Sequence, residues 1–475
     1  MNFEPLLYAV LAILLLAFGG VSARAQESRP EKLWLYEVAL SSDGSELAIG
    51  ATFSDIEPEF LLAGGFEFVG AATARLGATK VVPVVDGDFL RVKKGKRGDW
   101  RLDYRFRLRD AAKRFDTWVE DEGKGAAILV PGAWLLRPAG ASGSARVRLE
   151  TKASSDLSIV LGARLAADGK AHEFGAGEIA LLPYAAFGAL RRSAVEVGGA
   201  RLELAFLPGK LALTDAAVAA WIKDTAAVVA AYYERFPVKR TLVIVKPTKD
   251  EGVGQAAASG IGGTAVLLPL GSAAGERHLA EDWVLTHEMI HLALPNLPPS
   301  HRFLEEGIAT YVEPIARAMA GRLKPEEVFA EWVRDMPQGE PGEKEENGLV
   351  GTEDWGRTYW GGAAFCLLVD VRIRARTDGK KGLIDILRAI QADGASLEDA
   401  ADMRRLIPIA ERATGTTLFG DLYEEYRARP KSFMLDRLWE QLGVVKKGDS
   451  VVFDDAADLA RIRRSLFVLK REPGR

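Results

Sequence analysis

His287, Glu288 and His291 form an H-E-x-x-H motif. On a helix, the i, i+4 spacing places both imidazoles on one face, one turn apart, where they can bind the same metal ion. In such motifs the two histidines bind Zn²⁺ and the glutamate acts as a general base toward water. The pattern therefore predicts a hydrolytic zinc site.

The alternative is a pair of histidines that share a helix by coincidence. The chain has only 5 histidines among 475 residues, so such a match rarely arises by chance. Trp283, Val284 and Ile290 are apolar neighbours, which indicates a largely buried helix. A buried histidine pair needs a partner to offset its lost hydration, and a metal ion is such a partner.

A catalytic zinc site uses three protein ligands, whereas a structural site uses four. His301 is one candidate for the third ligand. The motif H-E-x-x-H-x-x-G-x-x-H, however, requires glycine and histidine where this chain has Leu294 and Leu297. The other candidate is a second helical pattern at residues 303–311, which contains two adjacent glutamates and follows a proline-rich turn.

These two motifs resemble those of the gluzincin metallopeptidases, in which a downstream Leu-x-Glu-Gly-x-Ala motif supplies the third zinc ligand. The resemblance implies that Glu306, which precedes Gly307, is this ligand and that Glu305 occupies a variable position. It covers about residues 215–375. The gap between His291 and the ligand glutamate is shorter than in the large gluzincin aminopeptidases.

The same resemblance implies an oxyanion donor from a Tyr-x-x-Gly-Ala motif, which Tyr359 and the residues after it match. Tyr311 is the next candidate for that role. Glu313, seven residues after Glu306, is a candidate for orienting a zinc-bound imidazole, with a surface carboxylate as the alternative.

The sequence thus predicts an exported zinc metallopeptidase that binds one Zn²⁺ per chain and acts on peptides or proteins. His287, His291 and Glu306 would hold the ion, Glu288 would transfer the proton of water, and Tyr359 would stabilise the oxyanion. One alternative is a binding or scaffold protein of the cell envelope with an inactive peptidase core. A zinc hydrolase with a non-peptide substrate would use the same residues.

Gluzincin aminopeptidases bind the substrate α-amine with a glutamate that follows a glycine-rich turn on the edge strand before the zinc helix. The corresponding residues 260–268 contain the glycines and a strand pattern but no acidic residue. We therefore expect cleavage of peptides with blocked N-termini. Glu305 and Glu251 are the alternative acids for an aminopeptidase.

Residues 6–21 form an apolar run that is short for a membrane span but typical of a signal peptide. The following Ala-Arg-Ala predicts cleavage after Ala25 and a periplasmic or extracellular protein. No Lys or Arg precedes the run, so an uncleaved membrane anchor is the alternative.

Composition limits the remaining possibilities. A chain with 48% hydrophobic residues is long enough for two or three domains. Its single cysteine, Cys366, lies in an apolar run, which predicts a buried thiol. The net charge of −4 argues against nucleic acid as a partner. Nothing in the sequence indicates an oligomeric state.

The predicted fold is a multidomain α+β protein. After the signal peptide (1–25) we expect an antiparallel β-sandwich-like domain (30–212), a thermolysin-like catalytic domain (213–335) and an all-α C-terminal lobe (336–475) that carries Tyr359. Residues 134–138 also resemble the exported glycyl-aminopeptidase group. The predicted strands are residues 34–40, 47–53, 100–108, 145–151, 158–165, 201–206, 241–245 and 265–268. The predicted helices, beside those of the two motifs, are residues 214–236, 357–376, 383–392, 397–414, 418–427 and 454–470.

Overall fold

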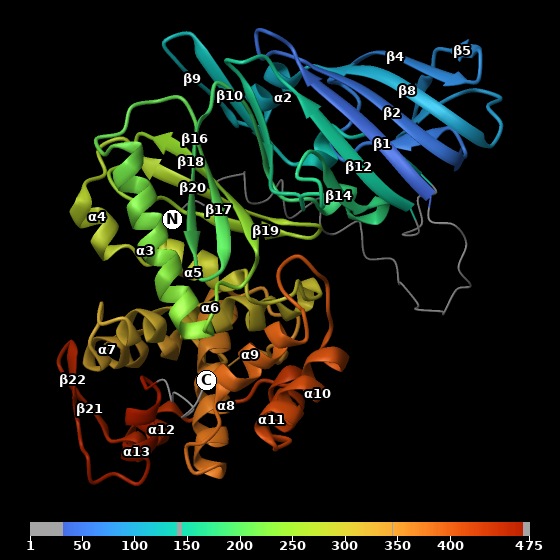
Figure 1. Ribbon diagram of the computed structural model, residues 1–475. Helices are drawn as coiled ribbons and strands as arrows, with labels where there is room; N and C mark the ends of the chain where they lie inside the picture. The colour runs from blue at the N-terminus through green and yellow to red at the C-terminus, as the bar shows by residue number, and fades with distance from the viewer. Residues whose placement is uncertain (1–31, 140–144, 344, 469–475) are drawn as a thin grey trace.

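The computed structural model describes residues 32–139, 145–343 and 345–468. The predicted signal peptide lies outside these ranges. Figure 1 shows β-sheets of the N-terminal part at one end, a second sheet with a long helix in the middle, and helices at the other end. Within the described ranges, no helix has the length and apolar character needed to cross a membrane. The predicted α+β fold class is confirmed.

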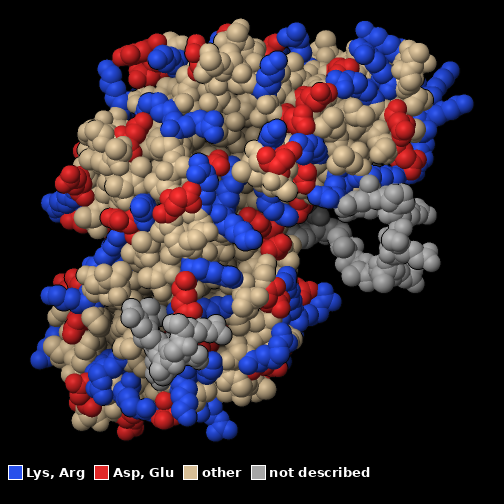
Figure 2. Space-filling model, viewed as in Figure 1, with Lys and Arg blue, Asp and Glu red and all other residues tan. Residues whose placement is uncertain are grey.

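A seven-stranded sheet dominates the N-terminal part, with the strand order β14-β12-β1-β2-β8-β4-β5. Its strands form because apolar and polar residues alternate, as in β8 (Gly98–Phe106), where Leu102 and Tyr104 are buried. On the other face, Arg101 and Arg105 form ion pairs with carboxylates at 3.0 Å. These arginines thus lie on a solvated face, and Figure 2 shows basic and acidic residues intermixed over the visible surface. One strand pair, β1 with β12, is parallel, although the sequence predicts antiparallel pairing throughout.

The strands of the N-terminal part are β1 (Lys32–Leu40), β2 (Leu47–Ile56), β3 (Glu59–Leu61), β4 (Val69–Leu76), β5 (Thr79–Val81), β6 (Val84–Asp86), β7 (Phe89–Arg91), β8 (Gly98–Phe106), β9 (Trp118–Asp121), β10 (Lys124–Leu129), β11 (Arg137–Pro138), β12 (Ala145–Lys152), β13 (Ser158–Leu161), β14 (His172–Gly175) and β15 (Ala185–Gly188). Helix α2 (Leu108–Arg114) and the 3-10 turns η1 (Pro131–Ala133) and η2 (Ala176–Leu181) connect some of them.

A four-stranded sheet, β13-β15-β10-β9, joins the N-terminal part to the middle of the molecule. Ala127 and Phe187 on one face of this sheet belong to the core of the seven-stranded sheet. Ile128 and Ala186 on the other face pack against Ile244 of the next sheet. Because the four-stranded sheet is apolar on both faces, it fixes its two neighbours relative to each other.

The middle sheet has the order β16-β17-β18-β20-β19. Its strands are β16 (Arg191–Val197), β17 (Ala200–Phe206), β18 (Arg240–Thr248), β19 (Ala257–Gly260) and β20 (Thr264–Gly271). The first two precede residue 213, where the sequence places the start of the catalytic domain. The strands β17, β18 and β20 run parallel, and the β18 segment is a continuous buried apolar run, as parallel strands require.

The edge strand of this sheet differs from the expectation. The predicted strand at residues 265–268 is part of β20, which lies inside the sheet between β18 and β19. The edge is β19 (Ala257–Gly260), which pairs antiparallel with β20 across a turn in which Gly262 and Gly263 adopt positive φ angles of 69° and 145°. The glycine-rich stretch therefore makes a hairpin, and its first strand borders the zinc motif.

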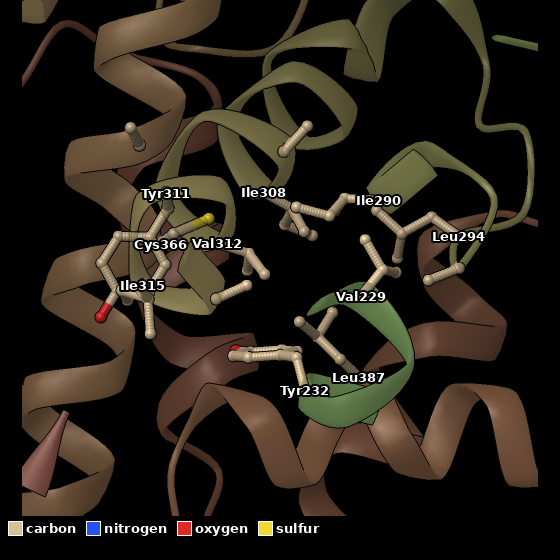
Figure 3. Packing of buried hydrophobic residues seen from close by; sticks show 14 of the residues in the cluster. Val229, Tyr232, Ile290, Leu294, Ile308, Tyr311, Val312, Ile315, Cys366 and Leu387 are labelled. Carbon is tan, nitrogen blue, oxygen red and sulfur yellow. The ribbon is translucent and has the colours of Figure 1, made fainter. Parts of the chain in front are cut away.

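Helices from distant parts of the sequence share one core with this sheet. Figure 3 shows side chains of α3 (Val229), α5 (Ile290), α6 (Ile308, Val312) and α9 (Leu387) gathered in one buried apolar cluster. Cys366 on α8 is also buried in this cluster, as predicted. Apolar residues at spacings of three and four on each helix explain this arrangement.

The helices are α3 (Asp215–Tyr233), α4 (Glu276–Glu281), α5 (Val284–His291), α6 (Arg302–Met319), α7 (Pro325–Asp335), α8 (Gly362–Arg376), α9 (Leu383–Ala392), α10 (Met403–Thr414), α11 (Leu418–Arg427), α12 (Leu435–Leu442) and α13 (Ala460–Ser465). Short turns are η3 (Pro299–His301), η4 (Met336–Gly339) and the π-helical η5 (Arg357–Gly361). A hairpin, β21 (Val444–Lys447) with β22 (Ser450–Phe453), interrupts the C-terminal lobe, which is therefore helical but not all-α.

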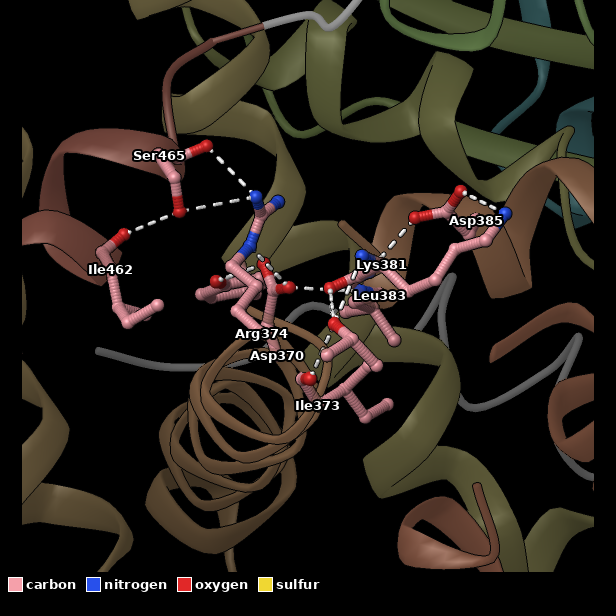
Figure 4. Close-up of polar contacts among 11 residues, drawn as sticks. Asp370, Ile373, Arg374, Lys381, Leu383, Asp385, Ile462 and Ser465 are labelled. Carbon is pink, nitrogen blue, oxygen red and sulfur yellow. Dashed lines mark hydrogen bonds and ion pairs between the residues drawn. The ribbon is translucent and has the colours of Figure 1, made fainter. Parts of the chain in front are cut away.

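A buried ion pair on α8 ties this helix to its neighbours (Figure 4). Asp370 accepts hydrogen bonds from Arg374 at 2.7 Å and from the amide of Leu383 at 2.8 Å. It also accepts one from Tyr311 on α6 at 2.9 Å, while Arg374 donates to the carbonyl oxygen of Ser465 at 2.9 Å. Because every member is paired, the buried charges are compensated. The cluster holds α8 against α6 and against the start of α9.

Candidate metal centre

Helix α5 (Val284–His291) presents the two histidines of the motif. Its first turn is capped by Asp282, whose carboxylate accepts hydrogen bonds from the amides of Val284 at 3.1 Å and Leu285 at 3.0 Å. The opposite face, with Met289, packs into the core. The imidazole rings of His287 and His291 lie side by side, with their centroids 4.9 Å apart.

Helix α6 (Arg302–Met319) brings a carboxylate to both imidazoles. Oε2 of Glu306 lies 3.3 Å from Nε2 of His287 and 3.4 Å from Nε2 of His291. Ordinary N–H···O hydrogen bonds are shorter, at about 2.7–3.2 Å. Two ligand atoms about 2.0–2.1 Å from one tetrahedral ion, however, lie about 3.3–3.4 Å apart. This donor set of two imidazoles and one carboxylate therefore fits zinc.

The adjacent Glu305 points elsewhere. Its Oε1 accepts a hydrogen bond from the amide of Leu297 at 2.7 Å, so it secures the loop between α5 and α6. Burial raises the pKa of Glu305 to about 7, although that hydrogen bond and the charge on His291 oppose the shift. The structure thus places Glu306, the ligand that the resemblance implies, beside the histidines and turns the neighbouring Glu305 away from them.

We expect that replacing Glu306 by Ala removes most of the bound zinc, since one of three ligands is lost. The matched Glu305→Ala protein should keep its zinc and lose only stability. Elemental analysis after dialysis against a weak chelator would measure both. Full zinc in Glu306→Ala together with none in Glu305→Ala would reverse the assignment.

Glu288 also lies close to the two histidines. One oxygen of its carboxylate is within 4.8 Å of a ligand atom on each imidazole. Its Oε2 accepts a hydrogen bond from the amide of Ala258 on β19 at 2.6 Å. Burial raises the pKa of Glu288 above its usual value, against the opposing charges of His291 and His287. A carboxylate held in this way beside the metal ligands is suited to accept a proton.

Tyr359 lies on the π-helical turn η5, at the other side of the histidines. Its ring stacks on His287, with 6.3 Å between the centroids and 24° between the planes. The guanidinium of Arg302 lies near the phenol and 3.5 Å from Oε1 of Glu306. Burial raises the pKa of Tyr359, and the charge of Glu306 adds to the shift, so the phenol keeps its proton.

Two glycines let α6 and α8 approach closely enough to bring Tyr359 to Glu306. A Cβ on Gly307 would overlap the backbone of Gly362. A Cβ on Gly362 would overlap the carbonyl oxygen of Phe303. These glycines belong to the Leu-x-Glu-Gly and Tyr-x-x-Gly motifs, so both motifs include the residue that makes their contact possible.

Replacing Gly362 by Ala should therefore force the two helices apart. We expect a loss of about 1–3 kcal/mol in the free energy of unfolding, as for other overpacked cores. Gly342, where a Cβ would meet nothing within 4 Å, supplies the control substitution to Ala. Urea denaturation would measure both, and equal stability of the two variants would contradict the close approach.

Comparison with known proteins gives matches in structure but not in sequence. No protein-family profile and no curated protein matches the chain. An aminopeptidase N family protein from Idiomarina loihiensis is similar in structure, with a TM-score of 0.63 and 12% sequence identity. The match covers 86% of this chain and 78% of that protein. The chain has the aminopeptidase N fold.

A second similar structure is an M1 zinc metallopeptidase from Deinococcus radiodurans, with a TM-score of 0.47 and 15% identity. The match covers 84% of this chain and 96% of that protein. The aminopeptidase N fold agrees with the gluzincin resemblance read from the sequence, because both place a β-rich region before a zinc peptidase fold and helices after it.

Other candidates from the sequence lie outside the site. His301 pairs with the hydroxyl of Tyr423 at 2.8 Å, and Tyr311 donates to Asp370, so neither faces the imidazoles. Glu313 is buried and accepts a hydrogen bond from Arg317 at 2.9 Å; it is thus neither a surface carboxylate nor a partner of either imidazole. Glu251 is exposed.

Sequence reasoning missed several residues of the site. The backbone amide of Ala258 has no sequence signal, because any residue except proline supplies one. Tyr184 comes from the N-terminal part; burial raises its pKa to about 12, and the charge of Glu288 adds to the shift. Arg302 could have been predicted as a neighbour of Glu306 from the sequence, since it lies four residues before Glu306 on the same helix face.

Proposed function

We propose that this protein is an exported zinc-dependent peptidase. The observation that carries the proposal is the pair of distances from Oε2 of Glu306, 3.3 and 3.4 Å, to the imidazole nitrogens of His287 and His291. The aminopeptidase N fold supports it, since the similar structures are described as aminopeptidase N family and M1 zinc metallopeptidase proteins. The site then has the residues that hydrolysis of a peptide bond requires.

His287, His291 and Glu306 would hold the zinc. When bound, the ion supplies Lewis acidity toward a carbonyl oxygen and makes water more acidic. The three side chains come from α5 and α6, which are both anchored in the main core. A ligand set on two packed helices is rigid before the metal arrives, so little conformational entropy is lost on binding.

Glu288 would act as the general base and then as the general acid. Its carboxylate would take a proton from the attacking water and give it to the leaving amine. The amide of Ala258 holds one oxygen, Oε2, at 2.6 Å and leaves the other free to receive the proton. The raised pKa of Glu288 makes it a better proton acceptor than an exposed carboxylate.

Tyr359 would donate a hydrogen bond to the oxygen of the scissile carbonyl as negative charge develops there. Its raised pKa keeps the phenol protonated and therefore able to donate. A protonated phenol has one O–H donor that it can direct toward the substrate.

The edge strand β19 would bind the substrate backbone. The amide of Ala258 points away from β20 toward Glu288, so this side of the strand faces the site. An extended peptide that adds to such an edge is recognised through main-chain hydrogen bonds. Backbone recognition of this kind gives affinity without selecting a sequence, so side-chain preference must come from other residues.

The direct test is cleavage of a peptide library by the zinc-loaded protein, with and without a chelator. We expect cleavage that stops when the chelator removes zinc and returns when zinc is added back. Cleavage that persists in the metal-free protein would refute the proposal. So would a zinc-loaded protein that cleaves none of the peptides.

We also expect peptides with acetylated N-termini to be cleaved at least as fast as free ones. The edge strand β19, Ala-Ala-Ser-Gly, has no acidic residue to pair with an α-amine, and Glu305 is occupied by the amide of Leu297. Rates for matched acetylated and free peptides would decide between an endopeptidase and an aminopeptidase. Strict dependence on the free amine would establish an aminopeptidase.

Export is the remaining part of the proposal, and it rests on the sequence alone. The apolar run at residues 6–21 and the Ala-Arg-Ala that follows predict cleavage after Ala25. N-terminal sequencing of protein from the periplasm or medium would test this. A mature chain that begins at Met1 and stays with the membrane would identify an uncleaved anchor instead.

A further inference from the structure

The tryptophans of this protein divide into two groups. Eight of the 10 are buried or partly buried, as expected for the largest apolar side chain. The other two, Trp283 and Trp355, are 53% and 49% exposed. An exposed tryptophan leaves a large apolar surface in water, and such residues are enriched where proteins bind partners.

Both exposed tryptophans lie beside the candidate metal centre. The ring of Trp283 is 5.8 Å from that of His287, and the ring of Trp355 is 5.1 Å from that of Tyr359. His287 and Tyr359 in turn stack at 6.3 Å. The four rings thus form a continuous row, with a metal ligand and the proposed oxyanion donor in the middle and an exposed indole at each end.

Neighbouring rings of this row are closer together than the side chains on one face of an extended peptide. Side chains on one face of a strand repeat every two residues, or about 6.6–6.8 Å. The steps between neighbouring rings, 5.1 to 6.3 Å, are shorter than that repeat, so two side chains on one face of a bound strand span at least one step. A peptide whose scissile bond lies at the two central rings can therefore direct side chains on either side of that bond toward the two indoles.

Both indoles are held by secondary structure rather than by flexible loops. Trp283 is the N-cap residue of α5, and Trp355 lies two residues before η5 (Arg357–Gly361). Within the described ranges neither indole N–H donates a hydrogen bond, whereas that of Trp118 donates to Glu120. Each indole thus offers an apolar face and a free donor that a peptide carbonyl can accept.

We propose that Trp283 and Trp355 form two subsites for aromatic or large aliphatic side chains, one on each side of the scissile bond. This inference rests on the proposed peptidase function, because it names the substrate class of the same site. The occupant is the substrate peptide, since the row is continuous with the residues proposed to act on it. Substrates would carry large apolar residues near the cleaved bond.

The experiment measures binding and so does not depend on turnover. The zinc-loaded Glu288→Gln protein would be titrated with acetylated, amidated alanine hexapeptides in which one Phe is moved through each position. We expect two positions at which Phe tightens binding, each by about tenfold, the scale of one aromatic stacking contact. Trp283→Ala should abolish the gain at one position and Trp355→Ala at the other.

Val85→Ala, which removes an exposed apolar side chain from β6 (Val84–Asp86), is the control and should leave both gains intact. Acrylamide quenching of tryptophan fluorescence supplies a test without any tryptophan variant. Since only two indoles are exposed, bound Phe peptide should protect most of the quenchable signal. A flat Phe scan, or gains that persist in both tryptophan variants, would overturn the subsites.

The outcomes separate this inference from the proposed function. Cleavage by the unmodified protein with a flat Phe scan would leave the peptidase standing and remove the subsites. Position-dependent binding without cleavage would keep the two subsites and remove the peptidase function. The protein would then be a peptide-binding protein. If the variants instead dissociate a dimer in sedimentation and the scan is flat, the tryptophans form a contact between copies and the proposal fails.

Discussion

Replacing Glu288 by Gln is expected to leave zinc bound and to lower turnover by about 10²–10⁴-fold, the usual contribution of a general base. The amide side chain keeps the shape of the carboxylate. It can still accept a hydrogen bond from the backbone amide of Ala258, which lies 2.6 Å from Oε2 of Glu288 in the unmodified protein. It cannot take a proton from water. Zinc content and the initial rate on an acetylated peptide would be measured on the same sample.

The control for this variant is Glu305→Gln. Glu305 is also a buried carboxylate that accepts a backbone amide, that of Leu297 at 2.7 Å, but it does not face the two imidazole nitrogens. Its amide variant should keep zinc and most of the turnover. Loss of zinc in Glu288→Gln would make Glu288 a ligand, and undiminished turnover would remove it from the mechanism.

The zinc helix and the strands with regular alternation were predictable because their signals are local. The residues of β8 alternate without a slip, and the four-residue histidine spacing requires only a helix turn. The fold class follows from these segments and their order. The short strands of the β21–β22 hairpin were not predicted, because their local strand pattern is weaker than the helical tendency of the surrounding lobe.

The edge strand shows what local signals miss. Residues 257–260 read Ala-Ala-Ser-Gly, which have little preference for a strand. They are extended because β20 pairs with them and because the glycine turn at 262–263 accepts positive φ angles. The pairing partner, rather than the residues themselves, decides the conformation, so only the tertiary structure places Ala258 against Glu288.

Spacing alone does not choose between Glu305 and Glu306. Neighbouring residues on a helix point about 100° apart, so only one can face a given site. The resemblance to gluzincins selected Glu306, and packing against α5 turns that residue toward the histidines. Glu313 shows that spacing along a helix does not by itself identify a residue of the site. Its spacing is compatible with the helix face of Glu306, but its partner is Arg317.

Replacing Tyr359 by Phe is expected to lower turnover by about 10²–10³-fold, the loss typical of one oxyanion donor. The phenyl ring keeps the stacking contacts with His287 and Trp355, at 6.3 and 5.1 Å, so the fold and the zinc content should not change. Only the hydroxyl is removed. Rates on the acetylated peptide and zinc content would be compared with those of the parent.

Tyr311→Phe is the matched control, because it removes a hydroxyl of the same kind from a different environment. That hydroxyl donates to the buried Asp370 at 2.9 Å, so its loss should lower stability and leave turnover nearly unchanged. If Tyr359→Phe retained full turnover while Tyr311→Phe lost it, the oxyanion donor would have to be reassigned. The structure argues against that outcome, since Asp370 already occupies the Tyr311 hydroxyl, whereas the O–H of Tyr359 remains available beside the zinc ligands.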